Sequence, residues 1–488
     1  MTMISKPLQL HNKCEDANVI RRMKVLLKVG CKLMESSADT QRILRNMKRT
    51  AAFLGFKEEN LQIYADYNLL MVNYSDDRCS YTKFQRCSNH AIDMAGISAI
   101  SKLSWRAIAN DYSLDQFEEE FDEICARPRV YKPWQVALGG GLACGGFCIQ
   151  FGCDWPSFFY ASIAAAVGLR MRMYLASKKM NSYINITIVA FVSTMIAWMF
   201  GVANTTTAFQ LPAWIQTTTP WHPMMACALF IVPGVPLINF VSDMLSGFQQ
   251  VGVTRAINTL LMVLAMAFGI SFAIEVVGID NFVNDLSMTP HHEYWEFSIA
   301  AAISAMGFSM IFNTPRRLLG VVAMGGVIAV CTRNFVSLGA SNGNVGLDMG
   351  PIIGSLVGSA LISIICIKAI HWHHTPHHCL SIPSVIPMIP GVLMYRALFA
   401  IIKMHGVVGE VTVAMNNGMR ASFIIICIAI GVAIPNIFIR RLMLPKHEKR
   451  MLMEHRMRKE NFTNITQKKY SLCKLYYKVN IFYGIKES

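Results

Sequence analysis

Long apolar stretches alternate with short polar connections along most of the chain beyond residue 130. A run of about 20 apolar residues is long enough to cross the hydrocarbon core of a bilayer as a helix. The pattern therefore predicts an all-α polytopic membrane protein that follows a polar N-terminal region. Ten transmembrane helices can be drawn, at roughly 134–152, 156–176, 183–204, 222–243, 254–278, 294–312, 316–334, 347–370, 380–403 and 419–440.

Two of these predicted spans contain a proline–glycine pair. The stretches are FIVPGVPLINFVSDML, residues 230–245, and PMIPGVLMYR, residues 387–396. Proline removes a backbone donor and clashes with the preceding turn, so each helix should break or kink at this pair. In hydrocarbon, a break survives only where it is buried in protein or faces a water-filled cavity.

The two interruptions belong to a weak internal repeat. GGFCIQF…SFFYASIAAAVGLRMRM has a counterpart in MGFSMIF…RRLLGVVAMGGVIAV, and each half of the predicted membrane region holds five spans. Because five is an odd number, the second half should enter the membrane from the opposite side, which makes the repeats inverted. Interrupted helices at matching positions of inverted repeats point to a transport site near the bilayer midplane.

The polar N-terminal region predicts a small α+β domain. We expect one helix over residues 18–54, capped by Gly55, then two strands around a turn at 66–68, a third strand, and two further helices. His90 and Asp93 would share a helix face near Cys87, which leaves a hydrolase site to be considered, although the more common role of such residues is capping. We expect four parts: a cytoplasmic α+β domain at 1–130, five-span repeats at 131–280 and 281–441, and a basic cytoplasmic tail at 442–488.

Composition agrees with a membrane protein, since 53% of the residues are hydrophobic and 15% are charged. Soluble domains carry about 25% charged residues. Much of the formal net charge of +15 lies at 21–49 and in the tail beside the last span. Basic residues that flank spans mark the cytoplasmic side and meet anionic lipid. We therefore expect both termini in the cytoplasm, a multi-pass protein of the cell membrane, and no nucleic-acid partner.

The residues around both interruptions resemble the threonine/serine exporter family, in which a small cytoplasmic domain and five spans are joined to a second five-span domain. Some members of that family are split into two chains, among them a bacterial succinate exporter pair. GCKLMESSADTQRILRNMKRTAAFLGF resembles the family's N-terminal helix, with Arg42 at its arginine. VPGVPLINFVSDMLSGFQQVGVTR resembles the family's pattern at Pro233, Gly234, Asp243, Gly247 and Arg255, and IPGVLMYRAL does so at Pro390, Gly391, Tyr395 and Arg396.

The resemblance covers about residues 20–440 and implies a small-molecule transporter. Substrate binding would fall to Pro233, Gly234, Asn239, Pro390, Gly391, Tyr395 and Arg396. Asp243 would carry the proton, because an ionisable group within a membrane is costly and is a functional candidate. Arg255 and Gly247 would have gating or structural roles.

Two of these assignments have structural alternatives. Asp243 could instead lie at the cytoplasmic end of its helix and pair with Arg255. Arg396 presents a planar fork that suits a substrate carboxylate, or it could form an ion pair with Asp243 or Glu275.

HWHHTPHHC, residues 371–379, crowds potential metal ligands into one loop but lacks the spacing of a defined tetrahedral site. We expect no metal site, no cofactor and no enzymatic activity, and no Walker A pattern is found. The leading hypothesis is a secondary-active exporter of small amino acids such as threonine and serine, driven by the proton gradient. The alternatives are a dicarboxylate (succinate) exporter of the same fold, a metal-ion transporter that uses the histidine loop, and a channel. Homo-oligomerisation is left open.

Overall fold

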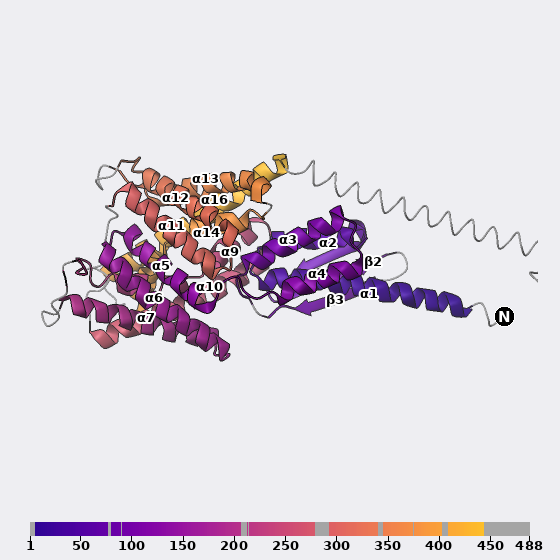
Figure 1. The fold of residues 1–488 in the computed structure, drawn as a ribbon, viewed down its shortest axis with the longest axis horizontal. Helices are drawn as coiled ribbons and strands as arrows, with labels where there is room; N and C mark the ends of the chain where they lie inside the picture. The colour runs from indigo at the N-terminus through magenta and orange to yellow at the C-terminus, as the bar shows by residue number, and fades with distance from the viewer. Residues whose placement is uncertain are drawn as a thin grey trace, which may run out of the picture.

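The computed structural model describes residues 5–76, 80–88, 90–205, 212, 214–278, 292–339, 345–373, 375–402 and 408–443. Most of the described chain is helical, and a small three-stranded sheet lies near the N-terminus. Figure 1 shows the α+β part at one end of the molecule and the helical part at the other.

The α+β part packs four helices with one antiparallel sheet in the order β1-β2-β3. Ile63 of β1 pairs with Val72 of β2, and Met71 of β2 pairs with Phe84 of β3. Leu70 and Val72, on one face of the central strand, are fully buried. The predicted strands are confirmed. The elements are α1 (Ser5–Glu35), α2 (Thr40–Phe53), β1 (Leu61–Ala65), β2 (Leu69–Ser75), β3 (Ser80–Arg86), α3 (Met94–Ala109) and α4 (Leu114–Ala126).

The prediction of one helix over residues 18–54 is wrong, because α1 ends at Glu35 and α2 starts at Thr40. Between them Ser37 adopts a positive φ of 62°. The side chain of Asp39 accepts a hydrogen bond from the backbone N–H of Arg42 and so caps α2. Serine and aspartate favour such caps over helix interiors, because their side chains compete for backbone hydrogen bonds.

The predicted helix face shared by His90 and Asp93 is also wrong. Both residues precede α3, and Asp93 is its N-cap, accepting a hydrogen bond from Gly96 N–H at 3.0 Å. His90 instead lies close to the carbonyl of Met34 (3.3 Å) and the side chain of Asn68 (3.0 Å). The two side chains therefore serve local structure, as the capping interpretation expected.

The helical part contains two series with the same order of elements. Each series has three long helices, a short helix, a 3-10 turn, a 12-residue helix and a final long helix. The 3-10 turns at this place are η2 (Leu229–Ile231) and η5 (Ile386–Met388), and the second series has a further one, η3 (Arg316–Leu318), between its first two long helices. The helices are α5 (Pro133–Phe151), α6 (Trp155–Ser177), α7 (Ser182–Thr205), α8 (Pro223–Ala226), α9 (Gly234–Leu245), α10 (Gln249–Val277), α11 (Tyr294–Ile311), α12 (Leu319–Ser337), α13 (Pro351–His373), α14 (His378–Val385), α15 (Gly391–Ile402) and α16 (Val408–Met443).

Within the described residues, six helices are long and apolar enough to cross a membrane, or eight if each bent pair counts as one span. The predicted spans at 134–152 and 156–176 correspond to α5 and α6, which are not among those eight. Ten spans therefore stay a prediction. Beyond residue 443, the predicted tail lies outside the described residues.

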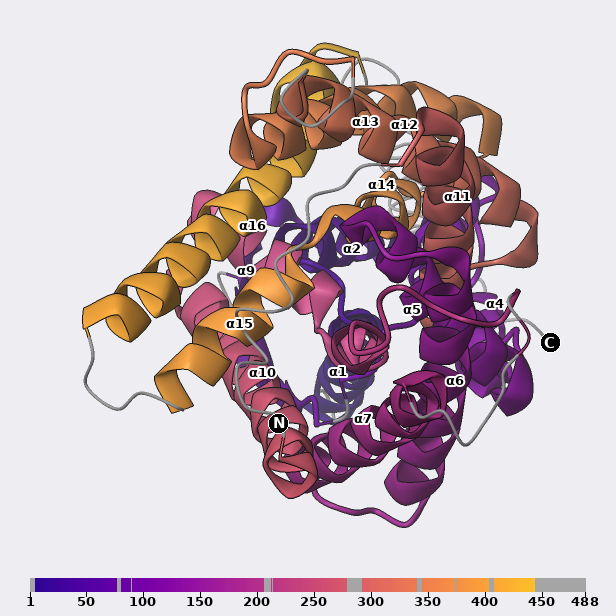
Figure 2. The same ribbon diagram turned by 90° about the vertical axis from the view of Figure 1, so that its left-hand side faces the viewer.

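The two series meet through small residues where α5 crosses α11. A Cβ at Gly146 would lie 2.7 Å from the carbonyl oxygen of Ala300, and one at Gly307 would lie 2.8 Å from Ala143 Cβ. Glycine at these positions lets the two backbones approach closely, as small residues commonly do between membrane helices. In the end-on view of Figure 2, the long helices follow a ring, and the buried helix α14 lies inside it.

Candidate functional site

The two proline–glycine pairs break their helices in the same way. The bend is 57° between Pro223–Ile231 and α9, and 54° between His378–Met388 and α15. At each break a three-residue turn forms, in which the N–H of Gly234 bonds to the carbonyl of Val232 (2.8 Å) and that of Gly391 to the carbonyl of Ile389 (2.9 Å). The breaks predicted from the sequence are confirmed.

The two breaks are packed against each other. A Cβ at Gly234 would lie 2.6 Å from Ile386 Cδ1 and 2.7 Å from Ile389 Cδ1. Reciprocally, a Cβ at Gly391 would lie 2.6 Å from Leu229 Cδ2. The contacts of one half are thus repeated by the other, with α9 packed on α16 and α15 packed on α10.

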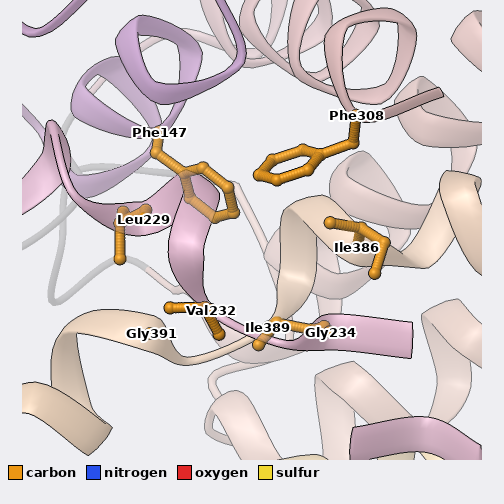
Figure 3. Close-up of a pocket in the computed structure, with 8 residues that line it drawn as sticks. All are labelled: Phe147, Leu229, Val232, Gly234, Phe308, Ile386, Ile389 and Gly391. Carbon is orange, nitrogen blue, oxygen red and sulfur yellow. The ribbon is translucent and has the colours of Figure 1, made fainter. Parts of the chain in front are cut away.

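A small apolar pocket lies at this contact (Figure 3). The free space within it is about 10 Å³, which holds about one water molecule, whereas ligand sites typically offer roughly 300 to 1,000 Å³. The pocket in this state is therefore too small for most solutes. Each half contributes four lining residues, which are Phe147, Leu229, Val232 and Gly234 from the first and Phe308, Ile386, Ile389 and Gly391 from the second.

The two phenylalanines of the pocket are residues that sequence reasoning missed. The rings of Phe147 and Phe308 point toward one another in Figure 3, with centroids 5.7 Å apart in an edge-on arrangement. Both follow a glycine in the repeated motif, GGFCIQF in one half and MGFSMIF in the other. That shared Gly-Phe was the available signal.

Asp243 lies near the end of α9, away from the pocket-lining residues, and only 1% of it is exposed. Its Oδ2 lies 3.3 Å from Nε of Arg255 on α10. Its Oδ1 accepts a hydrogen bond of 2.9 Å from the backbone N–H of Thr40, in the α+β part. The ion pair that we considered as an alternative for Asp243 is therefore present, and the carboxylate also holds the N-terminal part of the chain.

Two neighbours of Asp243 contact the same segment. Asn239 Nδ2 donates to the carbonyl of Ser37 (2.9 Å), and Arg255 Nη2 donates to the carbonyl of Ala38 (3.3 Å). We call residues 36–39, between α1 and α2, the docking loop. Three residues that we had assigned to substrate, proton and gating roles are thus brought together beneath this loop.

Asp39, the last residue of the docking loop, is a further charged group that sequence reasoning missed. Its Oδ2 lies 3.1 Å from Nε of Arg42 and 3.8 Å from Nε2 of His378 on α14. Burial opposes ionisation of this carboxyl group, but His378, Arg42 and Arg45 outweigh it and hold its pKa well below the ordinary value. Asp39 therefore stays negative at physiological pH. The Ser-Ser-Ala-Asp sequence, typical of a helix start, was the signal for this loop.

The remaining predicted residues lie elsewhere on the same elements. Tyr395 on α15 is 2% exposed, and its hydroxyl finds no hydrogen-bond partner among the described residues. Arg396 follows it and is partly buried, and neither residue lines the pocket. Gly247 is exposed and has a φ of +87° in the turn between α9 and α10, so its role there is a local backbone one.

The histidine loop divides into two parts. The side chains of residues 371–374 lie outside the described set. His377 contacts Ser363 Oγ at 3.0 Å, and His378 faces Asp39. Among the described residues, no group of three or more His, Cys, Asp or Glu side chains is arranged to hold a metal ion.

Comparison with known proteins gives the family. A family model for threonine/serine exporters matches residues 24–277, which is 254 of the 488 residues. The chain belongs to the threonine/serine exporter family. A second model, described as Threonine/Serine exporter, ThrE, matches residues 298–438, so both halves of this exporter-family chain are covered. The match to the first model ends at residue 277, the last residue of α10.

Two curated relatives each match about half of this family member. Probable succinate transporter subunit YjjP of Escherichia coli (strain K12) is 26% identical over 262 residues, which is 53% of this chain and 96% of the relative. The protein of the same name from Klebsiella aerogenes is 28% identical over 211 residues, 43% of this chain and 77% of the relative. No solved structure matches the chain. Family membership and the apolar helices establish a multi-pass membrane transporter.

Proposed function

We propose that this chain is a secondary-active exporter of threonine and serine across the cell membrane, coupled to protons. Its family supports export of these amino acids. The observation that carries the proposal is the pocket at the crossing of two broken helices, to which each half contributes equivalent residues. Such crossings suit a solute site that opens to either side as the two halves rock.

The proposed architecture is ten spans in two inverted five-helix repeats, with both termini in the cytoplasm. The repeated order of elements and the reciprocal contacts of Gly234 and Gly391 support two equivalent halves. With five spans a half, equivalent helices would run in opposite directions across the bilayer. The proposed part boundaries lie near residues 130, 280 and 441, and the end of the first family-model match at residue 277 supports the middle one.

The solute carboxylate would bind where α9 and α15 begin. A helix N-terminus carries partial positive charge and free N–H groups, which favour an anionic group. Both helices start at the glycines that line the pocket. Rocking of the halves would enlarge the pocket toward Tyr395 and Arg396, whose hydroxyl and guanidinium groups suit an amino acid.

Proton coupling is assigned to Asp243, with Asn239 on the same path. In this state the carboxylate is held by Arg255 and by the Thr40 N–H. A proton on Asp243 would cancel its charge and weaken both interactions, so protonation and opening of the cytoplasmic side would be linked. Gly247 would hold the turn that presents Asp243 to Arg255.

Solute counterflow in proteoliposomes tests this proposal, with labelled serine, threonine and succinate compared. Counterflow needs only binding and alternating access, so it does not depend on the energy source. We expect serine or threonine to exchange. Asp243→Asn should retain counterflow but lose proton-driven transport. If the variant keeps both, Asp243 has no role in proton coupling.

A dicarboxylate is the second candidate solute. The observation that favours it is the similarity of more than half of the chain to a probable succinate transporter subunit. The fold and the site would be unchanged, and Arg396 would suit one of the two carboxylates. Exchange of succinate alone in the same counterflow assay would establish this candidate in place of the amino acids.

A further inference from the structure

The docking loop connects the α+β part to both halves of the membrane part. Ser37 and Ala38 accept hydrogen bonds from α9 and α10, and Thr40 donates one to Asp243 of α9. Asp39 faces His378 of α14, in the second half. Successive residues of one short segment thus contact helices of both series.

The charges beneath the docking loop are buried, and each is held by a partner across the interface. Asp243 is 1% exposed, Arg255 4% and Asp39 4%. Separating a buried ion from its partner is costly unless water replaces the partner. If the loop left its place, Asp243 and Arg255 would therefore become open to water from the cytoplasmic side.

A second contact fixes the α+β part without reaching this cluster. Asn313, which follows α11, donates from Nδ2 to Asp93 Oδ1 at 2.7 Å. The backbone N–H groups of Met94 and Ala95 donate to the carbonyls of Phe312 and Asn313. This contact anchors the start of α3, so the docking loop is not needed merely to attach the α+β part.

We propose that the docking loop, residues 36–39, is the inner gate of the transporter, and that Asp39 holds it closed through His378. The loop accepts the hydrogen bonds of Asn239 and Arg255, and Thr40, which follows it, donates to Asp243. A solute or proton would need to reach these polar groups from the cytoplasm. Opening to the cytoplasm requires the loop to leave these groups, which makes the α+β part a working component of transport. This inference rests on the proposed transport function.

The test compares Asp39→Asn with Asp93→Asn as a matched control. Both residues are helix N-caps and both face the membrane part. Asparagine caps helices as well as aspartate does, so each variant should fold. Only Asp39→Asn removes a charge from the docking loop itself, because Asp93 lies outside it, at the start of α3.

The first measurement is hydrogen–deuterium exchange of the full chain in lipid nanodiscs. Asp39→Asn should speed exchange in residues 36–42 by about tenfold, which corresponds to a loss of roughly 1.4 kcal/mol of docking. Exchange in β2, Leu69–Ser75, should not change, which shows that the variant is folded. Equal exchange of residues 36–42 in Asp39→Asn, Asp93→Asn and wild type would overturn the role of Asp39.

The second measurement is the apparent KM for the transported solute from each side, in vesicles of opposite orientation. If the gate is closed most of the time, its release raises the fraction of the protein that can bind solute from the cytoplasm. The cytoplasmic KM should then fall by up to about tenfold, the same factor as the change in hydrogen exchange. The outer KM should not fall. A KM shift of the same size and sign on both sides, or in Asp93→Asn as well, would contradict the inner gate.

The two proposals fail in different ways. If wild type exchanges none of serine, threonine and succinate, the proposed function fails, and hydrogen exchange still shows whether Asp39 holds the loop. If wild type transports a solute and Asp39→Asn leaves the cytoplasmic KM unchanged, the transport function stands and the inner gate is rejected.

Discussion

Gly234 and Gly391 occupy positions that a larger side chain could enter only by displacing residues of the opposite half. The nearest atoms to an added Cβ are side-chain ends at 2.6 to 2.7 Å, closer than van der Waals contact. The residue type at each break therefore sets how closely the halves approach. Toward the other end of α9, Asp243 and Arg255 are buried together as an ion pair.

Alanine at either break should loosen the contact between the halves. Gly234→Ala and Gly391→Ala should each cost about 1 to 3 kcal/mol through overpacking and slow solute counterflow. Gly320→Ala on α12 is the control, because nothing lies within 4 Å of its added Cβ. Melting temperatures in detergent and counterflow rates check this. Equal stability of all three variants would contradict the packed contact.

Removing one partner of the Asp243–Arg255 ion pair should destabilise the protein more than removing both. Arg255→Met leaves Asp243 buried without its cation and should destabilise the protein by about 3 kcal/mol. Adding Asp243→Asn to that variant should restore part of the loss. The melting temperatures of the single and double variants are the measurement. If the two substitutions act independently, the double variant will be less stable than Arg255→Met, which would contradict the coupling of the two charges.

Elements form where local sequence dictates them, and the two bent pairs show this most directly. Each break combines a proline with a glycine, and both breaks bend by similar angles. The apolar pattern likewise gave the places of the long helices, and alternation in the N-terminal region gave the strands. The split between α1 and α2 was not found, because apolar spacing continues across residues 36–39 while Asp39 caps a new helix.

The turn between α9 and α10 depends on the backbone of Gly247. Its φ of +87° is strained for other residues, and open space surrounds its Cβ position. Gly247→Ala should therefore cost about 1 kcal/mol through backbone strain alone, and Gly247→Asn less, because asparagine tolerates positive φ better. Thermal unfolding of the two variants checks the order. A more stable alanine variant would show that the turn relaxes freely.

At the scale of the whole molecule, the α+β part and the membrane part form one charged interface. The hydrogen bonds at the docking loop join residues 202 to 217 positions apart in the chain. No local pattern carries such pairings, which is why sequence reasoning proposed Asn239, Asp243 and Arg255 but not the loop that covers them. The interface also includes Tyr67, whose ring lies beneath Arg255 and stacks on His90.

Acidification should weaken this interface through His90. Burial lowers the pKa of His90, and Arg255 on α10 lowers it further, while the Met34 carbonyl and Glu35 on α1 oppose the shift. The folded state favours the neutral ring of His90. Its contribution to the free energy of unfolding is therefore complete above the ordinary pKa of about 6.5. It is lost as the pH falls from there toward the lowered pKa.

The measurement is the melting temperature between pH 7.5 and 5.5, for wild type and His90→Gln. Wild type should lose stability as the pH falls through this range, and the variant should lose less. Asp39 should not contribute to this change, because its lowered pKa keeps it ionised. An equal loss in both proteins would assign the effect to another group.

The reciprocal packing of the two breaks also has a consequence for biosynthesis. The pocket-side neighbour of Gly234 is Ile386, which is added 152 residues later, since 386 less 234 is 152. At roughly 5 to 20 residues per second, the ribosome needs about 8 to 30 seconds to supply it. During that interval the first broken helix stays in the membrane without its cover, and we expect the insertion machinery or a membrane chaperone to shield it.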